Sequence, residues 1–193
     1  MKKTLLLSVF LIHFIPATHA FDLELRAACL YPQEPRIRQI YGNEGFPEGE
    51  LEMAGPVINK HWAAWGNLSY YRKNGHSSCL HDKTHLSNWT LTSGLKYFIC
   101  LSDPLSPYVG LGAGIDYAHF NNHSSYIQSV NQWGIAAVAK SGLMVKLTEL
   151  LFLDLFVDYS YNWLRTKRSR HCVSSRNINT GGLKGGVGLG FHF

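Results

Sequence analysis

Charged side chains recur at every second position along several stretches of the chain, a spacing that brings them to one face of an extended strand. Carboxylates that face ammonium or guanidinium groups in a narrow space can form a salt-bridge network or line a small channel. An unpaired ion in such a space is strongly destabilising, so we expect the network, with a channel lined by the same residues as the alternative. The candidate residues are Glu24, Arg26, Glu52, Lys96, Asp116, Lys140, Lys146, Asp154, Asp158 and Lys184.

Serine hydrolysis is a second chemistry to consider, because a serine nucleophile needs a base within hydrogen-bond reach. A histidine lies next to a pair of serines at two places in the sequence. These are His123 with Ser124 or Ser125, and His76 with Ser77 or Ser78. Neither group has an evident acidic third partner. No histidine or cysteine stands in a recognisable metal-binding motif. We therefore expect no enzyme activity, no metal and no cofactor.

The first twenty residues have the layout of a cleaved secretory signal peptide. Lys2 and Lys3 precede an apolar run, and a small-residue motif ends at Ala20. The sequence thus predicts a signal peptide over 1–20 and one mature domain over 21–193. Without the two lysines the formal charge is 5 − 2 = +3. This mildly basic chain has no nucleic-acid-binding motif, so nucleic acid is not an expected partner.

The remaining chain alternates apolar and polar residues with a period of two. Its clearest stretch is 150–165, where Leu153, Leu155 and Val157 alternate with Asp154 and Asp158. No later stretch offers about 18 consecutive apolar residues, so we expect no transmembrane helix. The expected strands are 21–31, 50–58, 62–72, 89–99, 108–120, 132–147, 150–165 and 182–193.

The connections between these strands alternate in length. Short ones are expected at 59–61, 101–106 and 148–149, and long ones at 32–49, 73–87, 119–131 and 165–180. Short periplasmic turns and long external loops are typical of an eight-stranded, antiparallel, up-and-down transmembrane β-barrel, here with both termini in the periplasm. A soluble lipocalin-like barrel would have an apolar interior, whereas the inner face expected here is charged and rich in glycine.

Aromatic residues near the strand ends are expected to form a girdle at the membrane interface. They are Trp62, Trp89, Tyr108, Trp133, Tyr159, Tyr161 and Trp163.

Two features fall in the expected external loops. Cys79 and Cys172 lie in loops at the same end of the barrel, so a disulfide between them is possible, although the sequence alone does not choose the pairing. A basic run in the fourth loop could hold lipopolysaccharide phosphates or remain solvated. It contains Arg165, Lys167, Arg168 and Arg170.

One passage of the chain is Gly94-Leu95-Lys96-Tyr97-Phe98, followed by 106–114 (SPYVGLGAG). It is similar to a passage that recurs in the small eight-stranded outer-membrane barrels of the OmpA and OmpW kind, and the chain resembles these barrels. The final strand also looks like theirs, which the barrel-assembly machinery recognises. Gly188, Phe191 and Phe193 fit that signal, whereas Gly186 stands where a polar residue is more usual.

These features predict an outer-membrane barrel with a structural or surface-interaction role. Expected partners are outer-membrane lipids and lipopolysaccharide, the barrel-assembly machinery during insertion, and a host or surface ligand at the loops. The resemblance implies one alternative, an OmpW-like channel for small or apolar solutes. A lipid A-modifying hydrolase is a second alternative, and a loop-mediated adhesin is a third.

Overall fold

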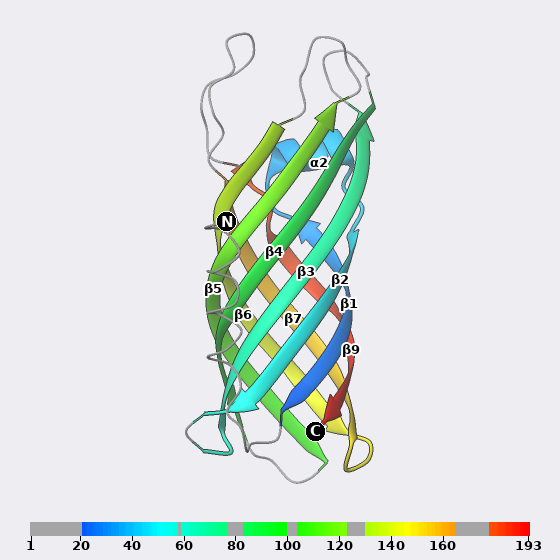
Figure 1. Ribbon diagram of the computed structural model, residues 1–193. Helices are drawn as coiled ribbons and strands as arrows, with labels where there is room; N and C mark the ends of the chain where they lie inside the picture. The colour runs from blue at the N-terminus through cyan, green and yellow to red at the C-terminus, as the bar shows by residue number, and fades with distance from the viewer. Residues whose placement is uncertain (1–20, 58, 77–82, 100–103, 123–129, 165–177) are drawn as a thin grey trace.

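In a computed structural model, eight antiparallel strands close into a barrel (Figure 1). The structure describes residues 21–57, 59–76, 83–99, 104–122, 130–164 and 178–193. The strands are β1 (Asp22–Pro32), β2 (Phe46–Pro56), β3 (Trp62–His76), β4 (Lys83–Phe98), β5 (Leu105–Asn122), β6 (Val130–Lys146), β7 (Leu151–Leu164) and β9 (Gly182–His192). A short helix, α2 (Pro35–Tyr41), and a two-residue strand, β8 (Ile178–Asn179), complete the described elements.

Every strand of the barrel pairs with the strands that neighbour it in sequence, and β9 closes the ring by pairing with both β7 and β1. The predicted barrel and its up-and-down order are therefore confirmed. The first and the last described residues meet at one end of the barrel, where Phe21 and Phe193 exchange backbone hydrogen bonds of 3.1 and 2.9 Å. The short connections lie at this end and the long ones at the other (Figure 1). In barrels of this type the long-loop end is extracellular.

Several strands extend further toward the long-loop end than the sequence predicts. β2 begins at Phe46 rather than at residue 50, and β4 begins at Lys83 rather than at residue 89. β3 continues to His76. The outward positions in these extensions are polar on β3 and β4, and on β2 they are Pro47 and Gly49, so alternation of apolar and polar residues no longer marks them as strands.

The outer wall of the barrel is apolar. Leu111 is 72% exposed, and Leu25 and Ile135 are each 66% exposed. Every second residue of a strand points to the same face of the barrel, and we say that such residues share a parity. The nearest residues that share the parity of Leu25, Leu111 and Ile135 on their strands are also aliphatic or aromatic, as lipid contact requires. No helix among the described residues combines the length and the apolar character needed to cross a membrane.

Candidate functional site

Arg26 on β1 lies at the centre of a charged network inside the barrel. Its Nη1 atom is 3.2 Å from both Glu50 Oε2 and Glu52 Oε2, and 3.1 Å from Asp158 Oδ2. Its Nη2 and Nε atoms reach Asp154 Oδ2 at 3.3 Å and Glu24 Oε1 at 3.1 Å. The guanidinium is fully buried, so five carboxylates from three strands converge on one cation away from water.

Three lysines extend this network along the barrel axis. Lys96 and Lys140 both pair with Glu52, and Lys140 Nζ is also 3.5 Å from Asp158 Oδ2. Lys184 pairs with Glu50 and, at 3.3 Å, with Glu48 Oε1. Glu50, Glu52 and Asp158 are thus each shared between two or more cations, which links the three lysines to Arg26, whereas Glu48 pairs with Lys184 alone.

Aromatic rings fill the space between the charges. The Arg26 guanidinium carbon lies 3.4 Å from the ring centre of Phe156. Lys140 Nζ lies 4.4 Å from the ring centre of Trp65, and Lys96 Nζ lies 4.5 Å from that of Tyr108. Cations over aromatic faces are stabilised electrostatically, and more so away from water.

Glycines on the facing strands provide the room that these rings need. A Cβ atom at Gly112 would lie 2.4 Å from Trp65 Cζ2, and one at Gly142 would lie 2.5 Å from the Tyr108 hydroxyl oxygen. On β9, a Cβ atom at Gly186 would lie 2.8 Å from Phe156 Cζ. Gly186 therefore has a structural role, because a side chain there would meet the Ala27 carbonyl oxygen, 2.1 Å from the Cβ position, as well as the ring beneath Arg26.

Asp116 lies apart from the network, toward the extracellular end. Its Oδ1 atom accepts hydrogen bonds from Thr90 Oγ1 (2.6 Å), Asn88 Nδ2 (2.8 Å) and Asn162 Nδ2 (3.2 Å). Its Oδ2 atom accepts one from Thr180 Oγ1 (2.9 Å). It forms no salt bridge with a described residue. Neutral donors alone therefore satisfy this buried carboxylate.

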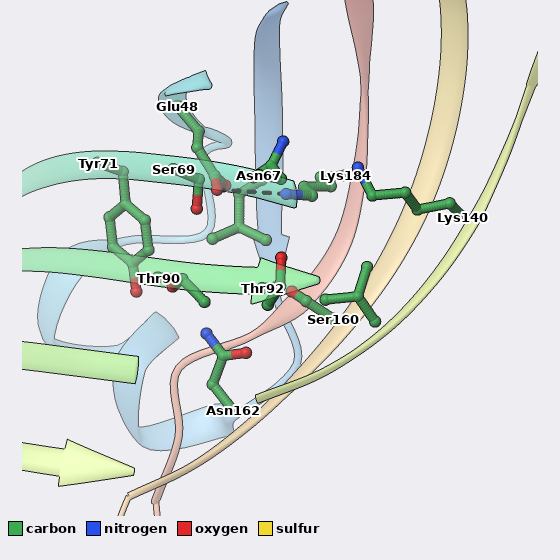
Figure 2. Close-up of a pocket in the computed structure, with 12 residues that line it drawn as sticks. Glu48, Asn67, Ser69, Tyr71, Thr90, Thr92, Lys140, Ser160, Asn162 and Lys184 are labelled. Carbon is green, nitrogen blue, oxygen red and sulfur yellow. Dashed lines mark hydrogen bonds and ion pairs between the residues drawn. The ribbon is translucent and has the colours of Figure 1, made fainter. Parts of the chain in front are cut away.

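A small polar cavity separates the network from the extracellular end (Figure 2). Glu48 and Lys184 border it on the network side, and Tyr71, Thr90 and Asn162 border it on the other. Its volume of about 10 Å³ is close to the minimum that holds one water molecule. No solute larger than water fits there.

An apolar cluster closes the extracellular end, and we call it the lid. It consists of Leu30, Ile37, Tyr41, Phe46, Tyr71, Leu86, Ala118 and Leu164. Ile37 and Tyr41, four residues apart on one face of α2, belong to this cluster together with inward side chains of β1–β5 and β7. Arg36 and Arg38, which flank this buried face on either side, are exposed.

Two glycines and one hydrogen bond hold the lid in place. Gly42 has a φ of 91°, which ends α2 and favours glycine. Gly75 on β3 lies so close to α2 that a Cβ atom there would be 2.4 Å from the Ile40 carbonyl oxygen. The Tyr41 hydroxyl lies 3.2 Å from Thr84 Oγ1, and burial raises the pKa of Tyr41.

The structure brings nearly all of the expected lumen residues inside the barrel. Lys146 is the exception, because it has the inward parity but lies exposed at the short-turn end of β6. It forms no salt bridge with a described residue. Its assignment to the charge network was therefore wrong, because position along the strand, and not side-chain direction alone, decides burial. The assignment of Asp116 to that network was also wrong, because Asp116 is buried in the lumen but accepts hydrogen bonds only from neutral groups among the described residues.

Tyr108 was wrongly assigned to the aromatic girdle. It is 1% exposed inside the lumen, where its hydroxyl donates to Asp154 Oδ2 at 2.7 Å and accepts from Arg26 at 3.2 Å. Its even number on β5, shared with Gly110 and Asp116, already indicated the inner face. Trp65, Phe152 and Phe156 are further lumen residues that the sequence reasoning missed, although they have the inward parity of their strands.

The other expected girdle residues lie on the outer wall and are half-buried or exposed. They are Trp62, Trp89, Trp133, Tyr159, Tyr161 and Trp163. Phe191 and Phe193 are exposed at the short-turn end, and Gly188 packs against Glu24 inside. Three expectations lie outside the described residues: the disulfide between Cys79 and Cys172, the basic run that begins at Arg165, and the serines beside His76 and His123. The signal peptide lies outside them as well.

Comparison with known proteins identifies the fold. No family model matches the chain, and no curated protein matches it in sequence. Among solved structures, the chain is similar to Ail, the attachment invasion locus protein of Yersinia pestis, with 17% identity over 91% of this chain and 99% of Ail (TM-score 0.58). It is also similar to OprG of Pseudomonas aeruginosa, with 14% identity over 91% of this chain and 96% of OprG (TM-score 0.62).

Neisserial surface protein A is a third similar structure, with 12% identity over 90% of this chain and 95% of that protein (TM-score 0.59). These likenesses confirm the expected fold, that of the small eight-stranded outer-membrane barrels. The apolar outer wall and the charged, closed interior fit an outer-membrane location.

Proposed function

We propose that this protein is a closed outer-membrane barrel that presents its extracellular end to partners outside the cell, without conducting solutes or catalysing a reaction. The observation that best supports this proposal is that side chains fill the lumen at successive levels along the barrel axis. The Arg26 network, the hydrogen-bonded Asp116 and the apolar lid follow one another along the axis. The cavity of about 10 Å³ between network and lid cannot pass a hydrated ion.

Conductance across a planar bilayer tests this proposal. The protein is refolded into detergent, checked for the heat-dependent gel shift of a closed barrel, and inserted at known orientation. We expect a folded barrel that carries no steady current. A steady current that changes when Lys140 or Asp154 is neutralised would refute the proposal and support the small-channel alternative.

An anionic ligand suits the extracellular end, because α2 exposes Arg36 and Arg38 there. Ail, whose fold is similar, has been solved with the heparin analogue sucrose octasulfate. We expect the refolded protein to bind immobilised heparin, and the double variant Arg36→Gln/Arg38→Gln to bind at least fivefold more weakly, since each cation near an anionic surface contributes about 1 kcal/mol. Unchanged binding would exclude α2 as the contact.

The loop that contains Arg165, Lys167, Arg168 and Arg170 is a second proposed contact, here with lipopolysaccharide phosphates. Deleting 166–176 should weaken binding to lipopolysaccharide without preventing the gel shift.

The proposal also assigns Phe193 to recognition by the barrel-assembly machinery. It excludes hydrolysis of lipid A, so Ser124→Ala and Ser125→Ala should leave the lipid A profile of cells that produce the protein unchanged.

A further inference from the structure

A row of aromatic side chains crosses the outer wall of four adjacent strands. Tyr70 on β3 pairs in register with Trp89 on β4, Trp89 with Tyr117 on β5, and Tyr117 with Trp133 on β6. The ring centres of Tyr70 and Trp89 are 4.4 Å apart, and those of Tyr117 and Trp133 are 4.8 Å apart. Tyrosine and tryptophan on a lipid-facing wall mark the level of the membrane interface.

Beyond this row, on the extracellular side, the same outer wall becomes polar and basic, and we call this region the β3–β6 band. Its side chains have the parity of the aromatic row, so they point outward rather than into the lumen. In register order they are Arg72, Ser87, His119 and Asn131, then Asn74, His85 and Asn121, then His76 and Lys83. The band contains no acidic residue.

The strongest donors of the band are available to a partner. Arg72, His76 and Lys83 are exposed. Hydrogen bonds between imidazole Nδ1 atoms and Asn side-chain oxygens orient two of the histidines, His85 to Asn74 at 2.6 Å and His119 to Asn131. The acidic Glu44 pairs instead with Lys73, which has the opposite parity on β3. No described carboxylate therefore neutralises Arg72 or Lys83 through a salt bridge.

We propose that the β3–β6 band binds the phosphate groups of outer-leaflet lipids. The band lies just beyond the interfacial aromatics, at the depth of lipid headgroups, and faces sideways toward them. Guanidinium, ammonium and imidazole donors over such a surface form charge-assisted hydrogen bonds with phosphate. A soluble polyanion has better access to Arg36 and Arg38 on α2. The inference rests on the membrane location in the proposed function, and it adds a defined lipid site to it.

The test compares lipid preference in two matched double variants. The protein is inserted into bilayers of zwitterionic phospholipid mixed with an anionic phospholipid that has brominated acyl chains, and tryptophan quenching reports the anionic lipid at the barrel wall. Arg72→Gln/Lys83→Gln should lower the preference for anionic lipid at least fivefold. Arg36→Gln/Arg38→Gln removes the same charge from α2 and should leave the preference unchanged. Arg72→Lys/Lys83→Arg should retain it.

Equal loss in both glutamine variants, or no loss in either, would overturn the lipid site. Competition by millimolar inorganic phosphate would also overturn it, because the ligand would then be free phosphate. The gel shift distinguishes this failure from failure of the proposed function. If the wild-type protein inserts and shows the shift but Arg72 and Lys83 have no effect, only the lipid site is wrong. If the wild-type protein does not insert, the membrane barrel itself is refuted.

Discussion

Replacing Arg26 by methionine should be the most damaging single change in the lumen. The substitution keeps much of the side chain's length but removes the charge that lies within 3.1–3.3 Å of five carboxylates. Glu50, Glu52 and Asp158 retain lysine partners, whereas Glu24 and Asp154 have no other salt-bridge partner among the described residues. Loss of one partner from a buried pair costs about 3–5 kcal/mol, and we expect at least that decrease in the free energy of unfolding.

Urea unfolding of the refolded barrel in lipid, followed by gel shift and tryptophan fluorescence, measures this decrease. Lys146→Met removes one charge from an exposed position and should change the free energy of unfolding by less than about 0.5 kcal/mol. The double variant Arg26→Met/Asp154→Asn should be more stable than the sum of the single changes predicts, by about 0.5–3 kcal/mol, because one of the two orphaned carboxylates is gone. A loss for Arg26→Met no larger than for Lys146→Met would refute a stabilising network.

Three further predictions concern packing around this network and at the lid. Tyr108→Phe should cost about 1–3 kcal/mol in the same urea assay, because Asp154 loses the 2.7 Å hydrogen bond; an unchanged midpoint would contradict this. Gly142→Ala should cost about 1–3 kcal/mol through its clash with Tyr108, whereas Gly49→Ala, whose Cβ atom would meet nothing within 4 Å, serves as the control. Ile37→Ala should destabilise the lid by about 2–5 kcal/mol and increase backbone hydrogen exchange in α2 while leaving the strands protected; equal exchange throughout would show that the lid is not a separate unit.

The fold was predictable because alternation is a local property. Apolar residues at one parity and charged residues or glycines at the other identify the lipid and lumen faces within each strand. Asp116, Asp154 and Asp158 all lie where this pattern places them. Tyr108 was assigned to the girdle because it is aromatic and lies near a strand end. Its parity on β5 points instead to the lumen.

The lid was not predictable from the same pattern. Its helix is only seven residues long, with two buried side chains, so a periodic signal is hardly detectable. Leu30, Leu86 and Leu164 have the inward parity, but in the sequence each is a single apolar residue at the end of a different strand. Only closure of the barrel brings them together beneath α2.

The sequence by itself determined the barrel, the number of its strands and the face of each strand that carries charge, because side-chain direction in a strand depends only on position along it. Tertiary structure decided which charges meet. Arg26 is 128 residues from Asp154 and 132 from Asp158, and it reaches them because β9 closes the ring between β1 and β7. Strand register and ring closure set these distances across the lumen, and no local pattern encodes either.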